Sequence, residues 1–136
     1  MGSVLVGKKQ YLDKAMRVRK ILGGGMRQVG YMAAAGLYAL DHHIARMTED
    51  HQKAKSLGSA LTELDIVEAV DPIETNIIIF KLKENQDINH FTAQLEKDGV
   101  YISNMGQGKL RIVTHYDYTN AAHDHLIGVL RGLEMS

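Results

Sequence analysis

The stretch RVRKILGGGMRQ, residues 17–28, joins two helical patterns through three consecutive glycines. Glycine adopts backbone angles that are closed to other residues, so three glycines in a row predict a sharp turn where backbones approach closely. Arg27 follows the turn, and the small-residue run AAAG at 33–36 lets another backbone pack close to the next helix. We expect this turn to position the elements on both sides of it.

Apolar residues recur at helical spacing on both sides of the glycine turn. The pattern before the turn covers residues 8–22, with its charged residues on the side opposite Leu12 and Met16. The pattern after the turn covers residues 28–61, which predicts one long helix that bends or breaks near Gly58 or earlier. A short strand at 3–6 is expected to precede both helices.

Beyond residue 65 the pattern changes to short strands alternating with helices. Pro72 is the only proline, and it marks the expected hinge between the helical part and a compact part because it disfavours helix at the residue before it. The pattern predicts strands at 66–67, 76–82, 100–102 and 109–114, a turn at 104–108, and helices that begin at Asp87 and at Thr119 or Asn120. The fold class is therefore α+β, with long helices followed by a small antiparallel sheet covered by helices.

Length, charge and composition restrict the class of protein. The chain has 136 residues, enough for a core, and 16 basic residues balance 16 acidic ones. A net charge of zero creates no field that attracts nucleic acid or anionic lipid, so we expect neither nucleic acid nor membrane as a partner. Cysteine is absent, and the only apolar run near the N-terminus is Val4-Leu5-Val6, which predicts a cytoplasmic protein without a signal peptide.

The histidines invite a metal-site hypothesis, and helical spacing argues against it. His43 and His51 lie two turns apart on a helix, while the adjacent His42 and His43 point in different directions. We therefore predict surface or interface histidines and no metal site. The serines stand in no nucleophile-elbow context, so we predict no nucleophile in this chain.

Arg111 is the first candidate for a binding residue. It alternates with apolar residues in the strand predicted at 109–114, and a guanidinium in such a strand needs an anion. Two interpretations stay open on the pattern alone. The anion is either a structural partner, Glu74 or Asp117, or the carboxylate of a ligand that the planar fork binds through two hydrogen bonds.

Arg27 is the second candidate, at the helix start after the glycine turn. It either pairs with a nearby acid or faces a bound anion. Lys20 enters the same turn from the other side, where a cation can meet a phosphate or carboxylate. The amides of Gly24 and Gly25 can assist such an anion, although three glycines without a GxGxxG or Walker pattern are weak support.

Five blocks of the sequence resemble the threonine aldolases, which use pyridoxal phosphate (PLP) and belong to the aromatic amino-acid beta-eliminating lyase group. The blocks run in family order as GSVLVG at 2–7, RKILGGGMRQ at 19–28, AAAGLYAL at 33–40, EDH at 49–51 and LRIVTH at 110–115. The resemblance implies that the lysine forming the Schiff base with PLP precedes the first block. We therefore expect the C-terminal part of such an enzyme, without a catalytic lysine and without PLP bound by this chain alone.

The resemblance also implies a domain division and residue roles. Residues 1–27 would end the large PLP domain, 28–64 would form the linking helix or helices, and 65–136 would form a small C-terminal α+β domain. Arg111 would bind the α-carboxylate of the amino-acid substrate, and Arg27 would complete the anion environment. The supporting residues would be Lys20, Gly24, Gly25, Thr114 and His115.

The activity implied by the resemblance is cleavage of L-threonine or L-allo-threonine to glycine and acetaldehyde. The implied partners are the N-terminal domain and further copies of the subunit, as a tetramer built from dimers that share active sites. Two alternatives stay open: a non-catalytic ligand-binding or oligomerisation module, and another PLP-dependent beta-eliminating lyase.

Overall fold

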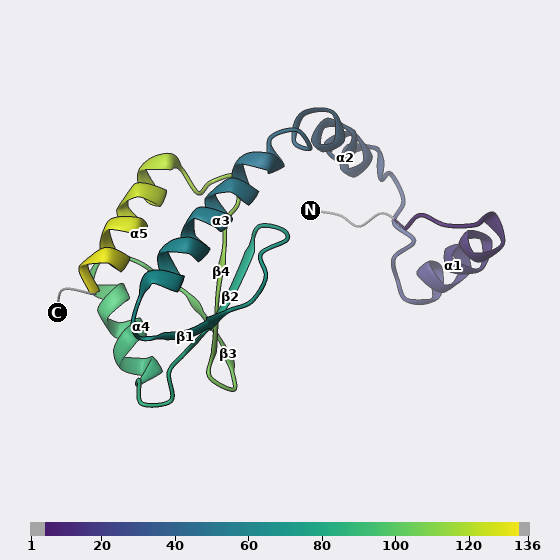
Figure 1. Cartoon of the computed structure of the whole chain (residues 1–136). Helices are drawn as coiled ribbons and strands as arrows, with labels where there is room; N and C mark the ends of the chain where they lie inside the picture. The colour runs from purple at the N-terminus through teal and green to yellow at the C-terminus, as the bar shows by residue number, and fades with distance from the viewer. Residues whose placement is uncertain (1–4, 134–136) are drawn as a thin grey trace. The chain divides into compact units, whose positions relative to one another are not determined.

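The computed structural model describes residues 5–133, and the contacts within the chain divide it after Arg46 into two compact units. The elements of the first unit are α1 (Lys9–Ile21) and α2 (Gly30–His42). The elements of the second unit are α3 (Met47–Glu63), β1 (Val67–Val70), β2 (Ile77–Leu82), α4 (Ile88–Lys97), β3 (Ser103–Gly106), β4 (Lys109–Val113) and α5 (Asn120–Leu133), all drawn in Figure 1. The strand predicted at 3–6 falls partly on residues 1–4, outside the described part of the chain, and residues 5 and 6 are not in a strand.

The glycine turn ends α1 through a Schellman motif. Gly23 has a φ of +79°, its amide donates to the Lys20 carbonyl at 3.2 Å, and the Gly24 amide donates to the Arg19 carbonyl at 2.8 Å. These two bonds satisfy carbonyls that the end of the helix would otherwise leave without a partner. A Cβ on Gly24 would lie 2.9 Å from Cγ of Arg19, so the close approach expected of these glycines is present.

The helix predicted over 28–61, with a bend or break near Gly58 or earlier, is two helices. α2 ends at His42 and α3 begins at Met47, with turn residues between them. Gly58 lies inside α3 without breaking it, and a Cβ at this position would collide with Ile73. Its role is close packing of the helix on the β1–β2 connection.

The sheet belongs to the second unit and has the strand order β1-β2-β4-β3, with every neighbouring pair antiparallel. β3 and β4 are joined by Gln107 and Gly108, which both have positive φ, as a tight hairpin turn requires. β3 begins at Ser103, after the strand that we predicted at 100–102. The strands predicted at 66–67, 76–82 and 109–114 and the helix that follows Asp87 are confirmed within a few residues.

The hydrophobic core lies between one face of the sheet and the helices α3, α4 and α5, which Figure 1 shows beside it. Alternation along β2 and β4 places Ile78, Phe80, Leu110 and Ile112 on the buried face. Phe80 meets Phe91 of α4 edge to face, with ring centroids 6.2 Å apart. Each such buried side chain stabilises the fold by about 1.5–3 kcal/mol through its burial.

α3 therefore packs with the sheet, although we expected it in the linking segment 28–64. Its buried residues are Asp50, Ala54, Leu57, Gly58, Ala60 and Leu61. Pro72 lies in the connection between β1 and β2, and the division of the chain falls after Arg46. The reason is that α3 carries the apolar stripe that covers the sheet, whereas α1 and α2 contain no buried residue.

Candidate functional site

Arg111 lies in β4 on the sheet face opposite the core. It pairs with Ile79 of β2 on one side and with Ser103 of β3 on the other. Its neighbours on this face include Ile77 and Val113, which are 42% and 39% exposed. The sequence alternation that predicted Arg111 thus places a cation on an accessible, partly apolar surface.

The guanidinium of Arg111 has an unmet hydrogen-bonding group. Its Nε is buried and makes no hydrogen bond, and no ion pair joins Arg111 to any residue of the described chain. The structural partners that we considered, Glu74 and Asp117, do not pair with it there. A buried donor without an acceptor costs free energy, so Nε of Arg111 is a position at which an acceptor would be stabilising.

Thr114 is fully buried at the end of β4 and points toward α3. Its hydroxyl donates to the Asp50 carbonyl at 2.7 Å, and its amide donates to the Asn76 carbonyl at 3.0 Å. In turn, Nδ2 of Asn76 donates a hydrogen bond to the Thr114 carbonyl at 2.6 Å. Thr114 supports the strand that holds Arg111, and its hydroxyl is occupied by the backbone.

His115 points to the exposed side of the loop after β4. The Asp117 amide donates to its Nδ1 at 3.2 Å, and a carboxylate oxygen of Asp117 lies 4.0 Å from the same nitrogen. Nδ1 accepts in this bond, so the proton of the neutral ring is on Nε2. The contact orders the ring locally.

The remaining candidates belong to the first unit. Arg27 and Lys20 are exposed, on the two sides of the glycine turn. The amide of Gly24 donates a hydrogen bond within the C-terminal cap of α1. A Cβ on Gly25 would lie 3.5 Å from Cγ of Lys20. Arg111, Thr114 and His115 belong to the second unit. The candidate residues are therefore divided between the two units.

Sequence reasoning missed a polar cluster between α3 and α5. Nε2 of His123 lies 3.2 Å from Oγ of Ser56, and its Nδ1 lies 3.4 Å from the Tyr118 hydroxyl. Nζ of Lys53 donates to the Tyr118 carbonyl at 2.6 Å. Burial lowers the pKa of His123 and raises the pKa of Tyr118 to about 12. No spacing rule connects these residues, because they meet only through packing.

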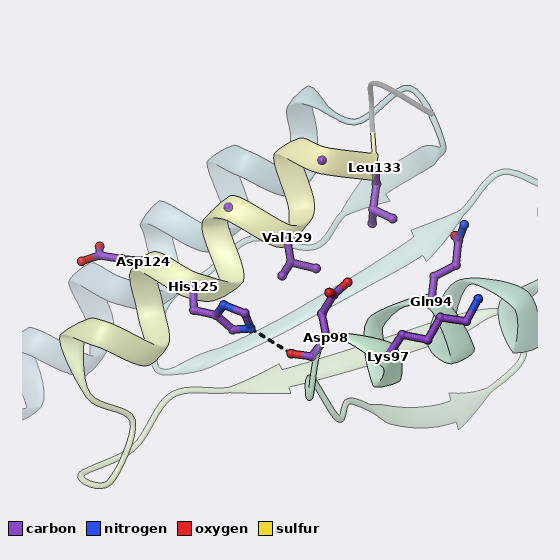
Figure 2. A pocket seen from close by; sticks show the side chains of 9 residues that line it. Gln94, Lys97, Asp98, Asp124, His125, Val129 and Leu133 are labelled. Carbon is purple, nitrogen blue, oxygen red and sulfur yellow. Dashed lines mark hydrogen bonds between the residues drawn. The ribbon is translucent and has the colours of Figure 1, made fainter.

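A hollow of about 580 Å³ opens between α4 and α5. Figure 2 shows Asp98 and His125 side by side in it, where Nε2 of His125 donates to the Asp98 carbonyl at 2.8 Å. Two glycines of α5, Gly128 and Gly132, line the hollow, and a Cβ on either would have no heavy atom within 4 Å. None of the predicted site residues lines it.

Within residues 5–133, no group of three or more histidine or acidic residues is arranged to hold a metal ion. Each helix in that range is too short or too polar to cross a membrane.

The family model of the beta-eliminating lyases matches residues 1–85. The chain therefore belongs to the beta-eliminating lyase family. Among its curated relatives, low-specificity L-threonine aldolase 1 of Arabidopsis thaliana is 35% identical over 124 residues, which are 89% of this chain and 35% of the relative. The low specificity L-threonine aldolase of Escherichia coli K12 is 36% identical over 119 residues, 86% of this chain and 34% of the relative. The chain thus spans about a third of the length of these relatives, and the predicted resemblance to threonine aldolases is confirmed.

Solved structures with the same fold include PLP enzymes. A decarboxylase from Sulfurospirillum multivorans matches with a TM-score of 0.64 and 15% identity, over 87% of this chain and 36% of that one. A C-DES variant with glycine covalently linked to PLP matches with a TM-score of 0.56 and 18% identity, over 74% and 27% of the two chains. The α+β class, as it occurs in PLP enzymes of fold type I, is confirmed.

Proposed function

We propose that this chain is the C-terminal part of a PLP-dependent lyase that cleaves L-threonine or L-allo-threonine to glycine and acetaldehyde. Support comes from the family membership and from threonine aldolase relatives that are about three times longer than the matched segment. Arg111 carries the proposal within this chain, because its buried Nε has no hydrogen-bond partner and the residue is half-buried on the sheet face opposite the core. The proposed division of labour leaves cofactor binding to the remainder of the protein.

Arg111 would bind the α-carboxylate of the amino acid. A guanidinium presents parallel N–H donors that match the two oxygens of a carboxylate, and the pair is stronger where water is partly excluded. Holding the carboxylate fixes the rotation of the amino acid about its Cα. Arg111 would thereby select which bond at Cα is aligned for cleavage, which is an orientation effect.

We assign PLP binding to the remainder of the protein. When bound elsewhere in the protein, PLP supplies an electron sink for cleavage of a bond at Cα. The glycine turn offers little to the cofactor phosphate, because the amides of Gly23 and Gly24 already cap α1. Arg27 and Lys20 remain exposed there, and we assign them to the anion environment near the substrate carboxylate or the phosphate.

The first unit supports the view that the chain works inside a larger assembly. α2 is apolar around its whole circumference except at its C-terminal end, yet none of its residues is buried. A helix that is apolar on every side is normally buried on every side. We assign its partners to the PLP-binding part of the protein and to further copies of the subunit, as a homotetramer in the cytoplasm.

The test is Arg111→Ala in the full-length enzyme, with the exposed Arg131→Ala of α5 as the matched control. Loss of a charged hydrogen-bonding pair predicts a rise in KM for L-threonine of about 10- to 100-fold for Arg111→Ala. Arg131→Ala should leave KM unchanged. An unchanged KM in both variants would refute the assignment of the carboxylate to Arg111.

A second candidate activity is beta-elimination, which the description of the family model favours. Product analysis separates the two reactions, because aldol cleavage of threonine yields glycine and acetaldehyde whereas elimination yields a keto acid and ammonia. A non-catalytic module would release neither set of products. It would be stabilised by amino acids in thermal melting without PLP.

A further inference from the structure

The polar contacts at the end of β4 lie three residues from Arg111 and join Thr114 to Asn76, a residue to which sequence reasoning assigned no role. Thr114 is fully buried, and its hydroxyl reaches the Asp50 carbonyl in the first turns of α3, 64 positions away. Asn76 stands directly before β2. A buried hydroxyl that finds a partner so far along the chain ties two elements together.

Asn76 holds both backbone polar groups of Thr114. Its carbonyl accepts from the Thr114 amide at 3.0 Å, and its side-chain Nδ2 donates to the Thr114 carbonyl at 2.6 Å. The regular β2–β4 ladder ends with Ile77 opposite Val113. Asn76 therefore extends the pairing by one position beyond the strand ends, with a side chain in place of a second strand amide.

The orientation of Arg111 depends on this pairing. Side chains alternate between the two faces of a sheet, so a slip of one residue would turn Arg111 into the core. Fraying at the end of β4 would also loosen the pairing of Arg111 with Ile79, two positions along. The bonds at Thr114 oppose both movements, since one fixes β4 to β2 and another fixes it to α3.

We propose that Asn76 and Thr114 are positioning residues for the carboxylate-binding Arg111. They act through a clasp, which consists of the hydrogen bonds that join Thr114 to Asn76 and to the Asp50 carbonyl. The inference rests on the proposed function, because it presumes that Arg111 binds the substrate. Asn76 and Thr114 touch neither substrate nor cofactor in this role. They set the angle and distance at which the guanidinium meets the carboxylate, where a misplacement of about 1 Å costs up to about 100-fold.

The experiment measures KM and kcat for L-threonine in the full-length enzyme, well below the melting temperature of every variant. Thr114→Val removes the hydroxyl at nearly constant volume, Thr114→Ser restores it, and Asn76→Ala removes the Nδ2 donor. Ile112→Val is the control for stability, because it removes buried side-chain volume on the same strand and leaves the hydrogen bonds of Thr114 and Asn76 unchanged. Arg111→Ala supplies the reference for loss of carboxylate binding.

We expect Thr114→Val and Asn76→Ala to raise KM about tenfold, with Thr114→Ser close to the parent enzyme and Ile112→Val unchanged in KM. If Arg111→Ala raises KM but Thr114→Val and Asn76→Ala only lower the melting temperature, as Ile112→Val does, the clasp is structural and the inference fails alone. If Arg111→Ala leaves KM unchanged, the proposed carboxylate role fails and the inference fails with it. Asn76 is partly exposed, so its variant tests the inference even if Thr114→Val does not fold.

Discussion

Nε2 of His123 lies 3.2 Å from the hydroxyl oxygen of Ser56, which joins α5 to α3 in the second unit. The other ring nitrogen lies 3.4 Å from the Tyr118 hydroxyl, so both sides of the imidazole have neutral partners. Lys53 of α3 disfavours a positive ring here, and Asp124 of α5 favours it. Burial outweighs the effect of Asp124, and the pKa of His123 is lowered from its ordinary value of 6.5.

The lowered pKa of His123 predicts loss of stability in mild acid. The unfolded state takes up a proton near pH 6.5, whereas the folded state resists it, so the unfolded state binds more protons below that pH. Stability from His123 is therefore present above about pH 6.5 and is lost as the pH falls through the folded pKa.

Denaturant unfolding at pH 7.5 and at pH 5.5 measures this effect. The difference in the free energy of unfolding between the two pH values should shrink in His123→Gln, which cannot titrate. The exposed His90→Gln of α4 is the matched control. An equal pH dependence in the parent chain and in His123→Gln would contradict the prediction.

We expect substitution by alanine to have opposite effects on stability at Gly58 and at Gly128. Both lie inside helices, where alanine is favoured over glycine by about 1 kcal/mol. A Cβ on Gly128 meets open space, whereas a Cβ on Gly58 would collide with the end of the Ile73 side chain. Gly128→Ala should stabilise the chain by up to about 1 kcal/mol, and Gly58→Ala should destabilise it by about 1 kcal/mol, since overpacking exceeds the helix gain.

The double variant Gly58→Ala with Ile73→Val identifies the cause of the Gly58 effect. Shortening Ile73 removes the atom that the new Cβ meets, so the double variant should be more stable than the sum of the single changes predicts. Thermal or denaturant unfolding of the four proteins gives the coupling energy. Strict additivity would show that the collision is not the source.

Among the core residues, we expect substitution of Phe80 to cause the largest loss of stability. It is 1% exposed, at the centre of the sheet, and meets Phe91 edge to face. Phe80→Ala should lower the free energy of unfolding by about 3–5 kcal/mol, because the cavity adds to the lost burial. Tyr101→Ala, at a residue that is 79% exposed, should change it by less than about 0.5 kcal/mol. Similar losses in both variants would mean that this core does not form as described.

The sequence by itself determined the elements that depend on neighbouring residues. Asp87 caps α4 by accepting a 2.8 Å bond from the Asn89 amide, as the cap pattern predicted. β2 follows its β-branched run, and the alternation around Arg111 placed that residue on the face opposite Leu110 and Ile112. Hydrogen bonds and alternation within a few residues are local, so local patterns reveal them.

Only the tertiary structure decided the relationships between distant segments. The apolar spacing through 28–61 continues across the break after His42. The position of the break could not be read from this spacing, because a short turn leaves the helical period of the apolar residues intact. A bend or break was expected near Gly58 or earlier, and the reason for a glycine at position 58 became visible only with Ile73 packed against it. The Thr114 hydroxyl donates to the Asp50 carbonyl, 64 residues away, because folding buries both groups and a buried hydroxyl needs a hydrogen-bond acceptor.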